Sequence, residues 1–141
     1  MRKVSIAAAA LSAAAVMLLS GCGPTTLVLP SEQTVSANFQ QSDIHAAILD
    51  AANARAWRVV SDKPGTVRLA YPSNNRATKY EATFDVVYTK TGYKIKYVKS
   101  YGLDEKPNCA GDMPCIHRNV NKWVSNLNTD IQRFLLNPRT K

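Results

Sequence analysis

Alternation of side-chain type over residues 80–97 is the feature that most limits how this chain can fold. Apolar residues occupy every second position from Tyr80 to Tyr88 and again from Tyr93 to Tyr97, with mostly charged or hydroxyl residues between them. A period of two is typical of a β-strand with one buried face. Lys90-Thr91-Gly92 separates the two runs and predicts a hairpin turn. The two strands are therefore expected to pair antiparallel, in a sheet that is covered on one side only.

Two more strands are predicted before this hairpin. Trp57-Arg58-Val59-Val60 has strand character, and Lys63-Pro64-Gly65 follows it as a turn signal. From Val67 to Tyr71 apolar side chains again occupy every second position, and Pro72 to Arg76 is expected to be a loop. Because the four strands are consecutive and separated by short turns, they predict an antiparallel meander.

A helix is predicted on each side of the meander. Ser42-Asp43 resembles an N-cap, and apolar residues at helical spacing predict a helix from about 43 to 55. A longer apolar stripe predicts a final helix from about 117 to 136, after a loop that runs from Tyr101 to about Cys115. Since the apolar face of the sheet needs cover, both stripes are interpreted as core. The sequence thus predicts a two-layer α+β domain, a four-stranded antiparallel meander with one helix before it and one after it, in the order α-β-β-β-β-α.

Residues 1–21 have the three-part pattern of an export signal. Basic residues at positions 2 and 3 precede an apolar run from Val4 to Leu19, and small residues at positions 20 and 21 precede Cys22. The run is short and rich in alanine, which is typical of a cleaved secretory signal rather than of a transmembrane helix. The remainder of the chain is expected to be exported.

Leu19-Ser20-Gly21-Cys22 resembles the lipobox of bacterial lipoproteins. The resemblance implies that Cys22 is acylated, that the signal is cut just before it, and that the chain is held on a membrane facing the periplasm. Several acyl chains, at about 0.8 kcal/mol for each buried CH₂, hold a protein far more firmly than one chain does. Gly23 follows the cysteine where an aspartate would favour the inner membrane, so the outer membrane is expected. The alternative is an ordinary secretory signal with an incidental cysteine.

Removal of the signal would leave 120 of the 141 residues, a size suited to one domain. Residues 22–41 are expected to be a lipidated N-terminus and flexible tether, with a typical span on the order of 25 Å. The apolar patch Leu27-Val28-Leu29 within it leaves two alternatives open, docking on the domain or a short edge strand. Residues 42–137 are expected to form a single periplasmic domain.

Two cysteines remain once Cys22 is assigned to lipid. Cys109 and Cys115 lie in one short loop, and in an oxidising compartment such a pair predicts a disulfide. Closing so small a loop stabilises a fold by roughly 2 kcal/mol. Metal binding is the alternative, but the spacing is wider than that of common zinc sites and only His117 lies nearby. No metal and no other cofactor is therefore expected.

The predicted polar face of the sheet is basic. Residues 1–21 carry two of the 18 lysines and arginines and no acid, leaving 16 against ten acidic residues, a formal charge of +6. Such a charge favours anionic partners, for which lipopolysaccharide, anionic lipid or an envelope protein are candidates. The scattered basic residues and the lack of a reader motif argue against nucleic acid. An ordinary solvated face is the alternative. The expected face consists of Arg58, Arg68, Lys79, Lys94 and Lys96.

The last third of the chain resembles a group of small, mostly uncharacterised bacterial lipoproteins. The likeness is carried by the Tyr93-Lys94-Ile95-Lys96-Tyr97 strand and by Ile116-His117-Arg118-Asn119-Val120-Asn121-Lys122-Trp123, against a family pattern I-H-x-x-Y-N-x-W. The chain departs from that pattern at Val120, where the group has tyrosine. The resemblance covers roughly residues 44 to 135, and it implies lipoprotein status and this fold without implying an activity.

His117, Asn121 and Trp123 are the candidate cluster for chemistry. The first two share one helix face, four residues apart, while Trp123 points elsewhere and inward. A structural interpretation has His117 capping the helix start or bracing the disulfide loop, and Asn121 bonding loop backbone. A functional interpretation makes His117 a general base that would need a loop carboxylate, for which Asp104, Glu105 and Asp112 are candidates.

The expected function is that of a binding or assembly module without catalysis. The sequence has no serine elbow, no phosphate-cradling glycine loop and no HExxH motif. His45, alone on the first helix, is expected to be a surface residue. The alternative is a small periplasmic hydrolase or ligand-modifying enzyme centred on His117.

Overall fold

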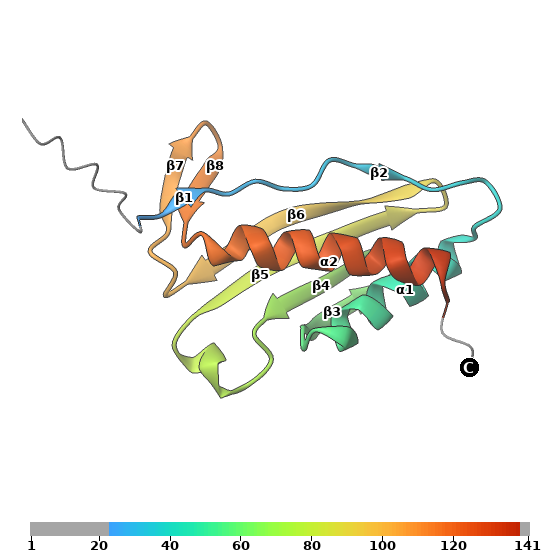
Figure 1. Ribbon diagram of the computed structural model, residues 1–141, viewed down its shortest axis with the longest axis horizontal. Coiled ribbons are helices and arrows are strands. Elements are labelled where there is room, and N and C mark those ends of the chain that lie inside the picture. Colours follow the sequence, from blue (N-terminus) through green and yellow to red (C-terminus); the bar gives the residue numbers. More distant parts are fainter. Residues whose placement is uncertain (1–22, 139–141) are drawn as a thin grey trace, which may run out of the picture.

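The computed structural model describes residues 23–138, in which two helices cover one face of a five-stranded antiparallel sheet (Figure 1). The predicted signal and Cys22 lie outside the described residues. No helix within this part of the chain is long and apolar enough to cross a membrane. The α+β class, with two helices and antiparallel strands, is confirmed. The prediction of a single four-stranded meander is wrong, because the strands number eight and form two sheets.

The larger sheet contains the predicted meander and one further strand. Its order is β2-β6-β5-β4-β3, and all neighbouring strands run antiparallel. The added strand β2 is only two residues long and pairs with the start of β6. Too short to show alternation, it carries no signal of its own in the sequence. The strands are β2 (Gln33–Thr34), β3 (Arg58–Lys63), β4 (Thr66–Tyr71), β5 (Glu81–Thr89) and β6 (Gly92–Tyr101).

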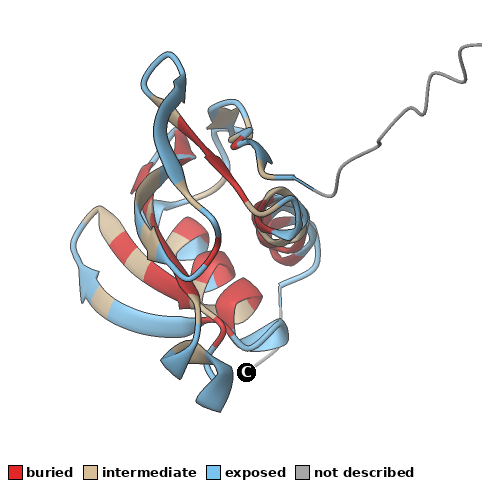
Figure 2. Cartoon of the chain, turned by 90° about the vertical axis from the view of Figure 1, so that its left-hand side faces the viewer, coloured by how far each residue is buried: buried red, intermediate tan, exposed pale blue. Residues whose placement is uncertain are grey.

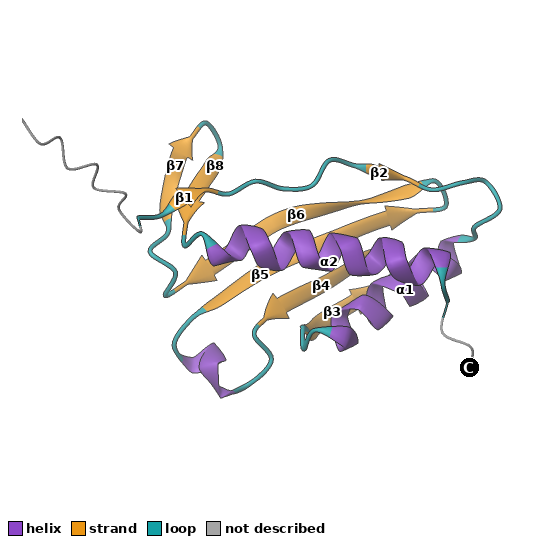
Figure 3. Ribbon diagram, viewed as in Figure 1, coloured by secondary structure: helices purple, strands orange, loops and turns teal. Residues whose placement is uncertain are grey.

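The smaller sheet combines one strand from the predicted tether with two strands from the predicted loop. Its order is β1-β8-β7, from β1 (Thr25–Thr26), β7 (Lys106–Ala110) and β8 (Met113–Ile116) (Figure 3). A disulfide joins Cys109 on β7 to Cys115 on β8, with 5.3 Å between their Cα atoms, as predicted. β7 and β8 are short, contain a proline each and show no alternation, so the sequence predicted a loop there. The pairing is visible only once the chain is folded.

Both helices begin at positions that differ from the predicted ones. α1 spans Gln41–Ala54, and Gln40 is its N-cap in place of Ser42-Asp43. Asp43 instead accepts a hydrogen bond from the backbone N–H of Gln40 at 2.7 Å, which closes the first turn. α2 spans Asn119–Leu136, and a short 3₁₀ turn η1 (Asn75–Thr78) interrupts the predicted loop between β4 and β5.

The core fills the space between the sheet and the two helices. Buried residues gather on the helix faces turned towards the sheet and on the sheet face turned towards the helices (Figure 2). Phe84 and Ile95 come from the alternating strands, and Ile48 and Ile131 come from the helical stripes. The apolar positions that gave the alternation in the sequence are thus the ones that the helices cover.

The segment predicted as a flexible tether packs along the domain in its described part. Leu27 is only 2% exposed and belongs to the core, so the docked alternative holds for the apolar patch. β1 pairs with β8, and β2 pairs with β6. A Cβ atom on Gly92 would overlap the carbonyl oxygen of Gln33, so glycine permits this close approach. We call residues 25–34 the N-terminal strap.

Candidate functional site

The sheet face opposite the helices is polar and rich in cations. Paired residues on neighbouring antiparallel strands point to the same face, and Phe84 and Val86 point into the core. Positions 81, 83, 85 and 87 on β5, with their partners, therefore point away from the helices. We call this surface the basic sheet face. Its charged residues are Glu81 and Asp85 with Arg58, Lys63, Arg68, Lys94, Lys96 and Lys99.

Two of the predicted cations on this face are paired with carboxylates. Arg58 donates to Glu81 with an N···O distance of 2.6 Å. Arg68 forms a bidentate pair with Asp85, both hydrogen bonds measuring 2.8 Å. The hydrogen bond from Arg68 holds the pKa of the Asp85 carboxyl below its ordinary value, and the nearby charges of Arg68 and Lys96 act in the same direction. The arginines therefore hold the sheet together more than they offer charge to a partner.

Apart from Lys63 on β3, the positive charge of this face that has no carboxylate partner among the described residues lies along β6. Lys94, Lys96 and Lys99 are exposed, and none of them forms an ion pair with a carboxylate of the described residues. Strict alternation would turn Lys99 towards the core, so the sequence did not place it on this face. A bulge beside Thr83 shifts the register and sets Lys99 opposite Thr83.

Lys79 was predicted to belong to the basic sheet face, but it does not. It lies outside the strands, as the C-cap of η1. A Cβ atom on Gly102 would overlap the carbonyl oxygen of Lys79, so this loop rests against the end of β6. The alternation that begins at Tyr80 was extended one residue too far in the prediction.

The Arg68–Asp85 pair predicts a specific acid dependence of stability. The pKa of Asp85 is lowered in the folded state, so its contribution is present above the unfolded value, about 3.9, and is lost as pH falls through the folded value. We expect Asp85→Asn to be less stable than the wild type at pH 7, and this difference to shrink at pH 3. Urea unfolding at both pH values measures it. Asp112→Asn, in the exposed β7–β8 turn, is the control and should show no such change.

His117 lies just before α2 and takes part in the helix start. Its Nδ1 accepts a hydrogen bond from the backbone N–H of Asn119 at 3.3 Å, and its own backbone N–H donates to Leu103 at 2.8 Å. Of the loop carboxylates, Glu105 accepts from the backbone N–H of Leu103 at 2.9 Å. No carboxylate of the described residues pairs with His117. His45, by contrast, contacts both carboxylate oxygens of Asp62 on β3 at 2.9 Å.

Asn121 holds the N-terminal strap. Its Oδ1 accepts from the backbone N–H of Val28 at 2.8 Å, and its Nδ2 donates to the carbonyl of Thr26 at 3.0 Å. A side-chain amide supplies one donor and one acceptor at a spacing that suits an extended backbone. Asn121 therefore bonds backbone of the N-terminal strap, and not that of the disulfide loop for which the bond was predicted.

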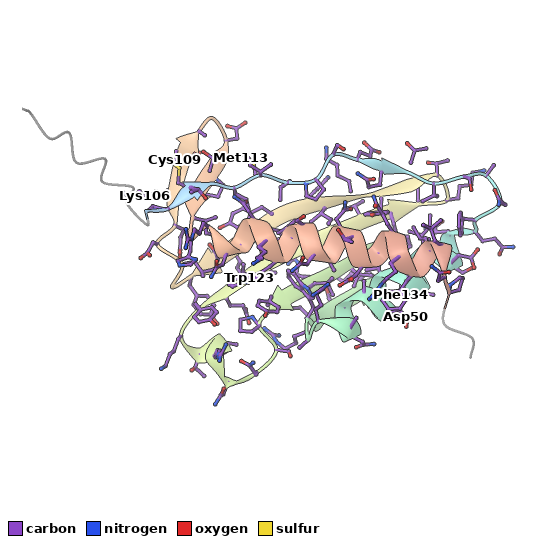
Figure 4. The ribbon with its side chains drawn as sticks, viewed as in Figure 1. Asp50, Lys106, Cys109, Met113, Trp123 and Phe134 are labelled. Carbon is purple, nitrogen blue, oxygen red and sulfur yellow. A yellow bond between two sulfur atoms is a disulfide. The ribbon has the colours of Figure 1, made fainter. Side chains whose placement is uncertain are left out.

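Trp123 belongs to an aromatic cluster that the sequence did not reveal. Its ring centroid lies 4.7 Å from that of Tyr71 and 6.1 Å from that of Tyr80, and Tyr71 lies 5.2 Å from Trp57. Trp123 is half-buried rather than wholly inward, on the side of α2 towards the η1 loop (Figure 4). The three candidate residues thus separate: His117 and Asn121 act at the start of α2, and Trp123 faces another part of the fold.

Three cavities lie on the helix side of the molecule. One of about 300 Å³ is lined by three residues of the aromatic cluster, Trp57, Tyr71 and Trp123, with Arg55 and Asn126. A second, of about 280 Å³, lies beside Tyr93, whose pKa is raised to about 12 by burial. A third, of about 770 Å³, lies along α1 beside the C-terminal end of α2, and Asp50 and Phe134 are among its lining residues. Within residues 23–138, no three His, Cys, Asp or Glu side chains are grouped closely enough to hold a metal ion.

Comparison with protein-family models finds none that matches the chain, and comparisons with curated proteins and with solved structures find no match either. The fold and these sites define a small α+β domain with one helix-covered and one open, cationic sheet face. Its function is therefore argued from the geometry of the sites themselves.

Proposed function

We propose that this chain is a lipoprotein anchored through Cys22 to the periplasmic face of a bacterial envelope membrane, the outer rather than the inner one. Its domain works there without catalysis, as a binding or assembly module. The basic sheet face is the contact surface, and the phosphate groups of anionic envelope lipids are the partner. An acidic envelope protein is the competing partner that the experiment below distinguishes.

The observation that carries this proposal is the row of unpaired lysines on an uncovered sheet face. The face holds six cations against two carboxylates, and both helices lie on the other side of the sheet. Lys94, Lys96 and Lys99 stand on one strand, exposed and without a carboxylate partner among the described residues. Lysine is a flexible point charge, which suits clustered phosphates whose positions are not fixed.

The alternative of an enzyme centred on His117 receives less support. A general base needs an orienting carboxylate or a nucleophile within hydrogen-bond reach. Nδ1 of His117 instead accepts the backbone N–H of Asn119, and its backbone joins the loop at Leu103. These hydrogen bonds give His117 a structural role at the start of α2.

Salt-dependent retention on vesicles tests the contact surface. Residues 23–141, without signal or lipid, are incubated with neutral phosphatidylcholine vesicles, with vesicles containing anionic phospholipid, and with vesicles containing lipopolysaccharide. We expect retention on one or both anionic types at low salt, and its loss at high salt, because free salt screens exposed charges. A lysine near an anionic surface contributes about 1 kcal/mol, so Lys94→Gln, Lys96→Gln and Lys99→Gln together should weaken retention about 100-fold.

A second triple variant provides the matched control. Lys90→Gln, Lys106→Gln and Lys122→Gln remove the same charge from exposed positions that are not on the basic sheet face. This variant should lose far less affinity than the first. Equal losses, or equal retention on neutral vesicles, would contradict the proposed surface. No retention on any vesicle, with salt-sensitive capture of an acidic envelope protein, would replace the lipid partner by that protein.

A further inference from the structure

The cavity beside the aromatic cluster is a second candidate binding site, separate from the basic sheet face. It lies between the end of α1, the end of β4 and the middle of α2. Its volume of about 300 Å³ is at the lower end of the range for small-molecule sites, which suits a ligand of one ring. The side chains that line it are Arg55, Trp57, Tyr71, Trp123 and Asn126.

Aromatic rings supply the apolar part of this cavity. Trp57, Tyr71 and Trp123 form a chain of ring contacts, with centroid distances of 5.2 and 4.7 Å. Tyr71 and Trp123 are only half-buried, so part of each ring remains accessible. Aromatic rings combine large apolar surfaces with polar handles, which suits a ligand that is apolar on one side and wet on the other.

Several hydrogen-bonding groups at the cavity have no protein partner. The side-chain amide of Asn126 forms no hydrogen bond with any described residue, although the residue is partly buried. The indole N–H of Trp57 has none either, although Trp57 is only 4% exposed. No fully buried side-chain nitrogen or oxygen atom of the described residues lacks a hydrogen-bond partner, so these two groups remain accessible to water or to a ligand.

Arg55, the charged side chain that lines the cavity, is paired with a carboxylate. Arg55 donates to the Asp130 carboxylate, which is buried and also pairs with Arg133 at 3.2 Å. Because the positive charge of Arg55 already has a carboxylate partner, the cavity offers no free charge for an anion. No carboxylate of the described residues lines the cavity, so it offers no partner for a cation either. The lining therefore favours a neutral ligand.

We propose that this cavity binds a neutral sugar ring, such as one unit of an envelope glycan. A pyranose ring has an apolar C–H face that can lie on Tyr71 and Trp123. Its hydroxyl groups, or an acetamido group, can accept from and donate to the amide of Asn126 and accept from an indole N–H. This site is independent of the basic sheet face, which lies on the other side of the sheet.

Tryptophan fluorescence gives a direct test, because both tryptophans of the chain line this cavity. The protein as the cell produces it is purified in a detergent without a sugar headgroup and titrated with N-acetylglucosamine, its β-linked trimer and maltotriose. Adenosine and inorganic phosphate serve as comparison ligands. We expect saturable fluorescence changes with at least one sugar, with a Kd of about 1 mM or below, and none with phosphate.

Variants separate the cavity from the rest of the surface. Asn126→Ala should weaken sugar binding by about 2- to 10-fold in calorimetric titration, the effect of one lost hydrogen bond, while leaving the unfolding transition unchanged. Asn119→Ala, on the same helix but exposed and away from the cavity, should bind as the wild type does. Absence of binding by all three sugars, tighter binding of adenosine, or equal effects of the two variants would overturn the proposal.

Discussion

Replacing Leu27 by alanine is expected to lower the free energy of unfolding by about 2–5 kcal/mol. The side chain lies in the N-terminal strap, is 2% exposed, and belongs to the hydrophobic core. Its loss would leave a cavity that neighbouring side chains fill only in part. Urea denaturation followed by circular dichroism measures the change. A flexible tether at this position would give no change at all, so the experiment decides between the two descriptions of the segment.

Val28 provides the matched control for this prediction. It is the next residue in the chain and is 65% exposed, so Val28→Ala should change the unfolding free energy by no more than about 0.5 kcal/mol. The backbone N–H of Val28 keeps its hydrogen bond to Asn121 in this variant. Similar small effects of Leu27→Ala and Val28→Ala would show that the strap does not pack in solution.

Replacing Cys22 by alanine is expected to abolish membrane anchoring of the mature form. The proposed lipobox chemistry requires the thiol, so the variant should incorporate no fatty acid and should remain as the longer precursor. Since several acyl chains hold a protein on a bilayer almost irreversibly, the wild type should stay in the membrane fraction after a high-salt wash. Labelled palmitate and the mass of the purified chain measure both effects.

Cys109→Ser is the control for the loss of a cysteine. It removes the disulfide with Cys115 and should lower stability by roughly 2 kcal/mol, yet it should still take up label at Cys22. If Cys22→Ala is labelled, or is cut to the same mature length as the wild type, the chain is not a lipoprotein of this kind. The chain would then be interpreted as an ordinary exported protein.

The strap changes what the proposed anchor implies for the domain. Only Gly23 and Pro24 separate Cys22 from Thr25, the first residue of β1. Extended chain spans at most about 3.6 Å per residue, so β1 would lie within roughly 10 Å of the acylated cysteine. A flexible tether would place a freely moving domain some 25 Å from the membrane. With the strap docked, the anchor would instead hold the domain close to the membrane at its β1-β8-β7 sheet. β1 is hydrogen-bonded to Asn121 of α2, so the attachment would lie at the end of the domain where α2 begins.

Periodicity alone predicted the larger part of the fold. Apolar side chains at every second position marked β5 and the first part of β6, and the stripe from Val120 to Leu135 marked α2. These patterns are local consequences of burying one face of a strand or helix, so one sequence suffices to show them. The spacing of Cys109 and Cys115 likewise predicted their disulfide.

The candidate sites were predicted less well than the fold. The sequence placed Arg58 and Arg68 on the polar face but could not show that Glu81 and Asp85 neutralise them. It named Trp123 but not its partners Tyr71 and Tyr80, which are some 50 and 40 residues away in the chain. Such contacts depend on how strands and helices pack against each other, and local sequence patterns do not predict that packing.

By itself the sequence determined the α+β class, the helices and the main antiparallel strands, because burying one face of an element requires apolar residues at that element's own period. Only the tertiary structure decided that the N-terminal strap belongs to the domain. Its two strands have two residues each and so show no periodicity. β1 forms by pairing with β8, β2 forms by pairing with the start of β6, and Asn121 bonds the backbone between them. Only the tertiary structure also decided which cations remain unpaired, since that depends on cross-strand register and on the bulge that turns Lys99 outward.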